Sequence, residues 1–323
     1  MKLGTRGSKL ALWQAHHVAD RLRAAGHATE VVTFTTKGDR ILDKPLAEIG
    51  DKGLFTQELD RALLDGTIHL AVHSLKDLPT TLPPGLMLAA VSEREEPWDA
   101  FVAHPDFGGG LADLPEGAIL ATSSLRRQAQ LKAWRPDLRV VPVRGNVPTR
   151  IAKLDASGPL DGNEESRGWH GAILAAAGLV RLDLADRIRE RIDPAVMIPA
   201  VSQGALGIVC AEADADTADA LRTVLADAVT TAATTAERAL LRRLEGGCQV
   251  PVAAWARIED GRLYLDGAVA SLDGSEHVRG QLDGDPSDAE ALGIELAERL
   301  LDRGAGAILA AIRDASAPDV RLT

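Results

Sequence analysis

The spacing of apolar residues predicts a helix and then a strand at the start of the chain. The apolar side chains of the first segment recur three or four positions apart, at Leu12, Ala15, Ala19 and Leu22. This spacing puts them on one face of a helix. Ser8 is a suitable N-cap and Gly26 a suitable stop, so the helix is expected to run through Ala25. Glu30–Thr35 follows with the β-branched composition of a strand.

A second helix and strand lead into a polar loop. We expect the helix at Leu54–Leu64 and the strand at Ile68–Val72, followed at once by HSLKDLP at 73–79. Alternating strands and helices predict a mainly parallel α/β sheet. Ligands of such sheets bind beyond the carboxyl ends of the strands. Lys76 and Asp77 are therefore in position to form a site.

The same alternation starts again after Ser92–Trp98, a charged segment that we interpret as a crossing between domains. The expected elements are a strand at Ala118–Ala121, a helix capped by Ser123 or Ser124, a strand at Val140–Val143, a helix containing Arg150 and a strand at Ala172–Ala175. They predict a second α/β domain. The polar segment 155–170 is typical of an exposed loop, and Pro194–Pro199 suggests a return crossing.

From about Thr230 the pattern changes from alternation to grouping. We expect a helix at Thr231–Leu244, strands at Val250–Ile258, Arg262–Ala270 and His277–Leu282, and helices at Ser287–Leu301 and Ala305–Ile312. Strands grouped before helices predict a small α+β third domain.

Composition narrows the class of protein. The chain has 323 residues and a net charge of −11, which argues against binding to nucleic acid or to an anionic membrane surface. Its two cysteines imply no disulfide framework, so we expect a reducing cytoplasm. Charges interrupt the N-terminal segment, so it does not resemble a secretory signal. No apolar stretch reaches the roughly 18–20 residues of a membrane span.

Basic residues are concentrated in one segment of this acidic chain. Residues 121–150 hold seven basic side chains against Asp137 alone, a local charge of +6. The basic residues are Arg126, Arg127, Lys132, Arg135, Arg139, Arg144 and Arg150. Arg126 and Arg127 are expected in the first turn of a helix, where the guanidinium groups and free backbone N–H groups together suit a carboxylate or phosphate. The alternative is a solvated helix face with surface ion pairs.

Two further positions have both a chemical and a structural interpretation. A carboxylate at Asp77 could stabilise a cation and transfer a proton, or it could fix the turn before Pro79. Cys248 follows Gly246-Gly247, which could expose its sulfur in a cleft, or it could be a small buried apolar residue. The histidines are scattered and neither cysteine lies in a CxxC, so no metal site is predicted. No nucleotide-binding glycine motif is present.

Together these segments resemble the porphobilinogen deaminases. The resemblance runs in order from Thr5 to Pro251 and so covers most of the chain. The matching motifs are Thr5-Arg6-Gly7-Ser8, Ala11-Leu12-Trp13-Gln14-Ala15, Lys52-Gly53-Leu54-Phe55, HSLKDLP at 73–79, TSSLRRQ at 122–128, RGN at 144–146 with Arg150, PAVSQGALGI at 199–208, and AER…LEGGCQVP ending at Pro251.

The resemblance implies a fold and a domain order. It implies two periplasmic-binding-protein-like α/β domains flanking a cleft, and a small α+β third domain that bears the cysteine. With the pattern above, it places domain 1 at 1–94 and 204–223, domain 2 at 99–198 and domain 3 at 228–323. A monomer without nucleic-acid or membrane partners is expected.

The resemblance also implies a reaction and a set of residue roles. A dipyrromethane cofactor, bound to Cys248 as a thioether, would accept four porphobilinogen molecules one at a time, each losing ammonia, before hydrolysis releases hydroxymethylbilane. Asp77 matches the catalytic residue that stabilises the azafulvene cation. The cofactor-binding positions match Cys248, Lys76, Asp77, Ser124, Arg126, Arg127 and Arg144, and the substrate-binding positions match Arg6, Ser8, Phe55, Arg144, Arg150 and Arg181.

The chain departs from the family pattern at a few positions. Pro148 stands where many relatives have Gly, and Ser202 replaces the Gly of PAVGQGA. The stretch Gly158–His170 is longer than usual, and Trp169-His170 replaces the common Tyr-Asp or Leu-Asp. We expect these changes to alter loops rather than chemistry.

Two other classes of protein remain open at this stage. A solute-binding protein for carboxylates would share the two-lobed fold, but it predicts a secretory signal and gives no reason for a third domain with Cys248. A transferase with Cys248 as acyl acceptor would need a histidine base, and none is close to it in sequence. The intact mass of the protein distinguishes the three, because only the deaminase carries a dipyrromethane adduct.

Overall fold

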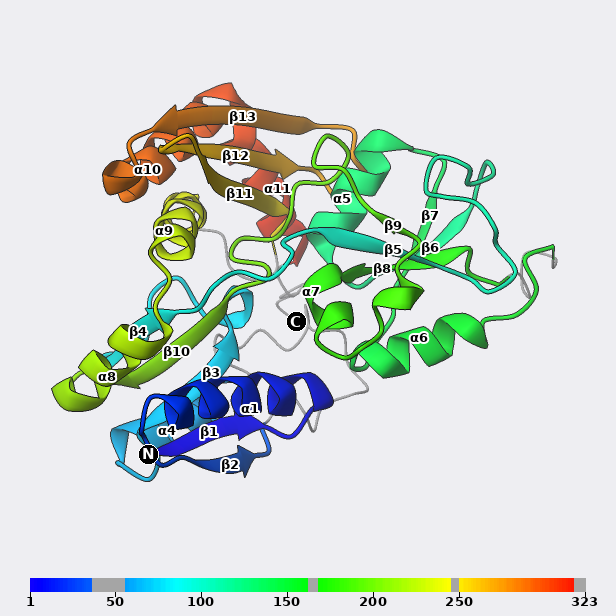
Figure 1. Cartoon of the computed structure of the whole chain (residues 1–323). Helices are drawn as coiled ribbons and strands as arrows, with labels where there is room; N and C mark the ends of the chain where they lie inside the picture. Colours follow the sequence, from blue (N-terminus) through cyan, green and yellow to red (C-terminus); the bar gives the residue numbers. More distant parts are fainter. Residues whose placement is uncertain (37–55, 162–167, 245–249, 317–323) are drawn as a thin grey trace, which may run out of the picture.

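Three groups of strands and helices build the molecule (Figure 1). A computed structural model describes residues 1–36, 56–161, 168–244 and 250–316. Two groups each contain a five-stranded sheet, and the third contains a three-stranded sheet. The α/β, α/β and α+β classes predicted for the three parts of the chain are confirmed. None of the helices in the described part of the chain is long and apolar enough to span a membrane.

The first sheet combines strands from residues 2–91 with a strand from residues 206–211. Its strand order is β2 (Glu30–Phe34), β1 (Lys2–Arg6), β3 (Leu70–Ser74), β10 (Leu206–Ala211) and β4 (Leu86–Val91). The helices packed with it are α1 (Lys9–Ala24), α4 (Gln57–Leu64) and α8 (Ala215–Leu225). The side chain of Ser8 caps α1 by accepting a hydrogen bond from the backbone N–H of Ala11, as predicted.

The second sheet repeats this plan. Its strand order is β7 (Arg139–Val141), β6 (Ile119–Ala121), β8 (Gly171–Ala175), β5 (Asp99–Ala103) and β9 (Glu190–Arg191). The associated helices are α5 (Leu125–Trp134), α6 (Val147–Asp155) and α7 (Ala176–Val180), with a 3₁₀ turn, η2, at Ala185–Arg187. Of the two serines considered for the cap of α5, the structure selects Ser124.

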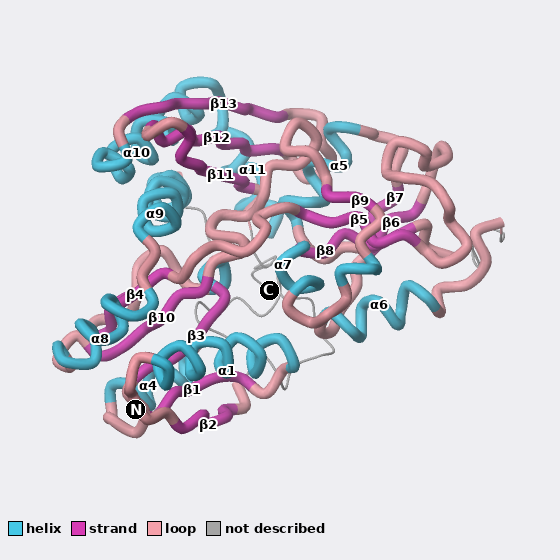
Figure 2. The backbone as a smooth tube through the Cα atoms, viewed as in Figure 1, coloured by secondary structure: helices cyan, strands magenta, loops and turns pink. Residues whose placement is uncertain are grey.

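The prediction of mainly parallel sheets is confirmed, but one strand in each sheet is antiparallel to its neighbours. β10 runs antiparallel to both β3 and β4, and β5 runs antiparallel to β8 and β9. β5 follows the outward crossing and β10 follows the return crossing, so each enters its sheet from the junction between the two sheets (Figure 2). The end of the sheet at which each strand enters therefore sets the direction of that strand. The spacing of apolar residues does not reveal this end, so it could not predict the direction.

The third group packs helices against one antiparallel sheet. The strands β11 (Val252–Glu259), β12 (Arg262–Ala270) and β13 (His277–Gly284) pair in sequence order. They share a core with α9 (Ala228–Arg243), α10 (Ala289–Leu300) and α11 (Gly306–Ser316). Short turns, η3 at Pro286–Asp288 and η4 at Leu301–Ala305, flank α10.

A buried carboxylate ties the outward crossing and the return crossing, which comprises the residues between β9 and β10, to the third group. The Glu237 side chain on α9 is fully buried and pairs with Arg94 of the outward crossing at 2.6 Å. It also accepts hydrogen bonds from the backbone N–H groups of Ser202 and Ala256, at 2.5 and 2.8 Å. One carboxylate thus joins both crossings to β11, and removing it would leave the Arg94 guanidinium and two N–H groups without this acceptor.

The return crossing turns sharply at Ser202 and Gly204. Their φ angles are +63° and +93°, in the region that disfavours a side chain. Ser202 therefore occupies a conformation that suits glycine better than serine. Its buried hydroxyl has no hydrogen-bond partner among the described residues.

Ser202→Gly is expected to stabilise the protein. Relief of the left-handed strain contributes about 1–2 kcal/mol, and removal of an unsatisfied buried hydroxyl about 1–3 kcal/mol. The greater conformational freedom of glycine in the unfolded chain reduces this gain in stability by about 0.5–1 kcal/mol. The midpoint of urea unfolding should rise. The urea midpoint of Ser202→Ala, which removes the hydroxyl but keeps Cβ, should lie between those of the parent and of Ser202→Gly. A glycine variant no more stable than the parent would show that Ser202 is not strained.

Candidate functional site

Two predicted site segments lie at the same edge of the first sheet. β1 ends at Arg6 and its parallel neighbour β3 ends at Ser74, so their carboxyl ends meet. A 3₁₀ turn, η1 (Leu75–Asp77), follows β3 directly and carries Lys76 and Asp77. Lys76 and Asp77 therefore lie beyond the carboxyl ends of parallel strands, as predicted, at the edge where ligands of such sheets bind. The Asp77 carboxylate is exposed, as a group that meets a substrate must be.

Arg126 and Arg127 lie in the first turn of α5, as predicted, but they are buried. Both pair with Asp99, the first residue of β5, at 2.8 and 2.7 Å. Arg126 also donates to the carbonyl of Ile198 and Arg127 to that of Ile173. The alternative of a solvated helix face is therefore excluded for this pair. Their acidic partner lies 28 residues before Arg127 in the sequence, outside the window that showed only Asp137.

The charge on Asp99 is fixed by these partners. Burial alone would raise the pKa of the Asp99 carboxyl, but the guanidinium groups of Arg126 and Arg127 outweigh burial and hold the pKa below its usual range. Asp99 is the residue of this cluster that sequence reasoning missed. Its place at the start of a strand after a charged crossing gave no local signal of a partner.

The amine of Lys76 reaches toward this cluster from the other sheet. Its Nζ donates to the side-chain oxygen of Gln203 at 3.3 Å. Burial lowers the pKa of Lys76 to about 8, with Arg127 and Arg126 acting in the same direction and Asp77 and Asp99 against it. The amine therefore loses its proton more readily than that of an ordinary surface lysine.

Arg150 adds a further basic group within electrostatic reach of Asp77 and Arg127. Its Nε, from α6, donates to the carbonyl of Gly145 at 2.8 Å. Burial, together with the charges of Arg127 and Arg144, lowers the pKa of Arg150 to about 10, while Asp77 acts in the opposite direction. Groups from both sheets therefore act on one another electrostatically. The excess of positive charge around Arg150 suits an incoming carboxylate.

Arg181 follows α7 and contacts the first helix of the other group. Its guanidinium lies 5.5 Å from the ring centroid of Trp13 and donates to the carbonyl of Gly204 at 2.6 Å. Trp13 in turn stacks on His17 at 5.1 Å. The buried Nε of Arg181 has no hydrogen-bond partner among the described residues. This unsatisfied donor is consistent with a ligand acceptor at this position.

Four of the remaining predicted residues fall into two classes. Ser8 and Ser124 act as helix caps, each accepting a backbone hydrogen bond. Phe55 and Cys248 lie outside the described residues. The predicted roles of all the site residues stay predictions.

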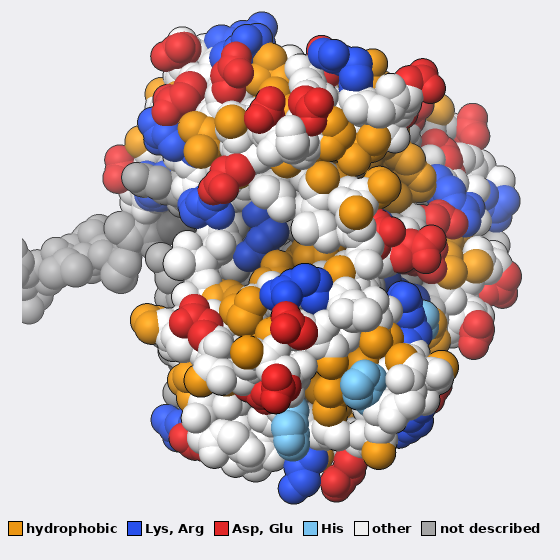
Figure 3. Space-filling model, turned by 60° about the vertical axis from the view of Figure 1, so that its left-hand side comes forward, with side chains coloured by type: hydrophobic (Ala, Val, Ile, Leu, Met, Phe, Trp, Pro, Cys, Tyr) orange, Lys and Arg blue, Asp and Glu red, His pale blue; other side chains and the backbone are white. Residues whose placement is uncertain are grey.

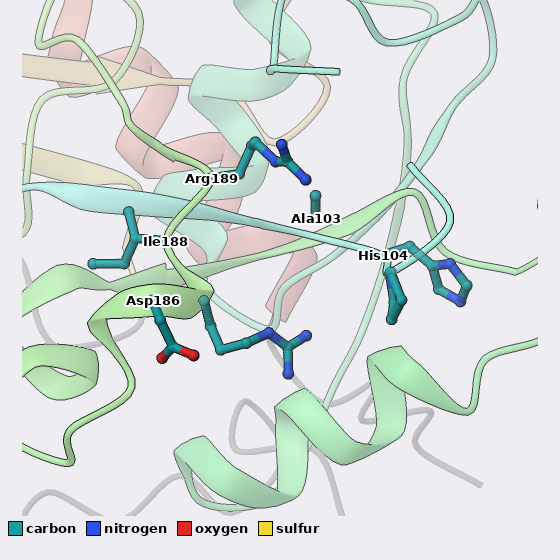
Figure 4. A pocket seen from close by; sticks show the side chains of 7 residues that line it. Ala103, His104, Asp186, Ile188 and Arg189 are labelled. Carbon is teal, nitrogen blue, oxygen red and sulfur yellow. The ribbon is translucent and has the colours of Figure 1, made fainter. Parts of the chain in front are cut away.

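The surface also has hollows away from these residues. One, of about 380 Å³, lies between β4 and α9. Figure 3 brings the side with α8, α9 and α10 forward and shows it hollowed across the middle, with Lys, Arg and apolar side chains nearby. Another, of about 370 Å³, is lined by His104, Asp186, Arg187 and Arg189 (Figure 4). Arg187 is already paired with Asp155 at 2.6 Å, so this second hollow is not strongly basic.

Comparison with known proteins gives matches over nearly the whole chain. The family described as "Porphobilinogen deaminase, dipyromethane cofactor binding domain" matches residues 1–219, and "Porphobilinogen deaminase, C-terminal domain" matches residues 231–302. The porphobilinogen deaminase of Desulforudis audaxviator is 56% identical over 313 residues, covering 96% of this chain and 97% of that protein. That of Syntrophotalea carbinolica is 50% identical over 314 residues, covering 97% and 96%.

Similar solved structures are more distant. The methionine-binding protein MetQ has a TM-score of 0.38 at 14% identity, over 70% of this chain and 94% of that one. The periplasmic aliphatic sulphonate binding protein SsuA from Escherichia coli has a TM-score of 0.36 at 15% identity, over 76% and 70%.

Asp99→Asn is expected to destabilise the protein by about 3–5 kcal/mol, because it leaves two buried guanidinium groups without their counter-charge. Urea unfolding measures the loss. Asp106→Asn is the matched control, since Asp106 lies in the same group but its side chain is 76% exposed; the control should stay within about 0.5 kcal/mol.

The pH dependence follows from the sign of the shift. The pKa of Asp99 is lower in the folded protein, so its stabilisation is present above the ordinary carboxyl range, about pH 4, and is lost as the pH falls below it. Asp99→Asn should therefore lose less stability than the parent protein on acidification. An equal acid dependence in both proteins would show that Asp99 is not the titrating group.

Proposed function

This chain belongs to the porphobilinogen deaminase family of transferases, and from this premise we propose that it joins four porphobilinogen molecules stepwise, releases ammonia at each addition and frees hydroxymethylbilane by hydrolysis. The observation that carries the proposal is the meeting of Lys76 and Asp77 from one sheet with buried arginines from the other. A substrate with acetate and propionate groups needs such a local excess of cations in an acidic protein.

The cofactor of this family is dipyrromethane, and the residues of the site fit it. Its acetate and propionate groups would offset the like charges that lower the pKa of Arg150, and would satisfy donors such as the Nε of Arg181. When bound, the cofactor supplies the free pyrrole carbon to which the first substrate unit is joined. The residues proposed to hold it are Lys76, Asp77, Ser124, Arg126, Arg127 and Arg144, with Cys248 as the thioether attachment point.

Asp77 is proposed as the catalytic group. Its exposed carboxylate would accept hydrogen bonds from pyrrole N–H groups of the substrate. As the C–N bond of porphobilinogen breaks and its electron pair leaves with ammonia, positive charge develops on the pyrrole. A carboxylate fixed beside that charge stabilises it through space.

The substrate carboxylates would be held by the basic groups that flank Asp77. We propose this role for Arg6, Ser8, Phe55, Arg144, Arg150 and Arg181, with Phe55 stacking on a pyrrole. A monomer in the cytoplasm and the domain limits 1–94 with 204–223, 99–198 and 228–323 belong to the same proposal.

The tether is tested by intact mass. The purified protein should exceed its sequence mass by one dipyrromethane and give a colour with Ehrlich's reagent. Cys248→Ser should lose both signals. Cys210→Ser is the matched control, because Cys210 is buried in β10 and should leave both unchanged. An adduct that persists in Cys248→Ser would remove that residue as the attachment point.

The role of Asp77 is tested by Asp77→Asn, which keeps the shape but removes the charge. Hydroxymethylbilane formation should fall by about 10²–10⁴-fold, while KM for porphobilinogen changes little, since the arginines still bind its carboxylates. Asp65→Asn, exposed at the end of α4, controls for a general loss of charge. A variant that turns over at the parent rate would exclude Asp77 from the chemistry.

A further inference from the structure

Gln203 stands between the two halves of the site. Its side chain is 1% exposed and lies on the return crossing. Its Oε1 accepts the hydrogen bond from the Nζ of Lys76 at 3.3 Å. Its Nε2 donates to the carbonyl of Pro97 at 2.7 Å and to the Asp99 carboxylate at 3.1 Å. One amide therefore contacts a cation of the first group and an anion of the second.

The orientation of this amide is set by its neighbours. Lysine is only a donor, whereas a carbonyl and a carboxylate are only acceptors. The oxygen must therefore face Lys76 and the NH₂ group must face Pro97 and Asp99. A reversed amide would place like partners against each other on both sides. Of the uncharged side chains, only an amide offers an acceptor and two donors in this geometry.

The backbone holds Gln203 at a fixed place in the junction. It lies between Ser202 and Gly204, both with positive φ. Its own N–H donates to the carbonyl of Ala200, and its carbonyl accepts from the Nε of Arg94 at 2.7 Å. Arg94 in turn pairs with the buried Glu237. The side chain is thus aimed by a turn that is itself anchored to the third group.

We infer that Gln203 is a positioning residue for the reaction. It fixes the position of the Lys76 amine relative to the Asp99–Arg126–Arg127 cluster, so that the groups from the two sheets form a single site. This inference rests on the proposed function and deepens it. Neither the carboxylate-binding arginines nor Asp77 needs to contact Gln203. The residue acts through Lys76 on one side and through Asp99 on the other.

The two contacts predict opposite effects of two substitutions on the proton affinity of Lys76. The charged groups that act on this amine are Asp77, Asp99, Arg126 and Arg127. Gln203→Met keeps the length of the side chain but removes the acceptor, which disfavours the charged amine. Gln203→Glu replaces the neutral acceptor by a carboxylate, which favours it. A role confined to packing would move the pKa of Lys76 in the same direction, or not at all, in both variants.

The test measures Lys76 directly in the protein with its cofactor bound. Acylation by acetic anhydride is followed at several pH values by peptide mass spectrometry, with the exposed Lys9 as internal reference. The midpoint of Lys76 labelling should move down in Gln203→Met and up in Gln203→Glu, each by about one pH unit. The pH profile of kcat/KM should move in the same two directions.

The outcomes separate this inference from the proposed function. Shifts of opposite sign support it, and unmoved or parallel labelling midpoints overturn it. If Gln203→Glu does not fold because its carboxylate repels Asp99, the downward shift in Gln203→Met decides alone. The labelling needs no turnover, so a parent protein that makes no hydroxymethylbilane would refute the proposed function while the labelling result still stands.

Discussion

The buried carboxylate of Asp99 is the interaction on which the arrangement of basic groups depends. Arg126 and Arg127 could not stay buried side by side without a counter-charge, because two like charges taken out of water repel strongly. Asp99 supplies this charge at the start of β5, where the chain enters the second sheet. The arginine pair is consequently fixed at the junction, within electrostatic reach of Lys76 from the other sheet.

A second buried carboxylate extends this junction to the third group. Glu237 accepts hydrogen bonds from both crossings and from β11, and Trp98 packs edge-on against Trp255 at 4.8 Å nearby. A movement of the two α/β groups about the crossings can either preserve these contacts or break them. Breaking them would expose a carboxylate and a guanidinium that the fold has already desolvated. Movements that leave this cluster intact are therefore the least costly.

The helices and strands could be predicted from local sequence patterns. The arrangement of the site, by contrast, depends on contacts between residues that are far apart in the sequence. The apolar spacing after Ser8 and the limits of β12 at Arg262–Ala270 could be predicted because both depend on neighbouring residues. The partnership of Asp99 with Arg127 could not, since 28 residues separate them and neither shows a local pattern. Gln203 lies 127 residues from Lys76, so the motif that contains it gave no indication of this contact. Resemblance supplied residue roles, but not the bonds that hold those residues.

The arginines of the site differ in how far a bound ligand would change their hydrogen bonds and their electrostatic environment. A guanidinium has five N–H donors, and Arg127 directs three of its nitrogens to Asp99 and Ile173. An incoming carboxylate can add to this pair but cannot replace Asp99 without breaking the junction. Arg150 is different, because burial and then the like charges of Arg127 and Arg144 lower its pKa, and an anion would relieve that repulsion. Ligand binding should therefore draw most of its electrostatic gain from the arginines around Arg150 and Asp77, while Arg126 and Arg127 supply a fixed field that changes little as substrate units are added.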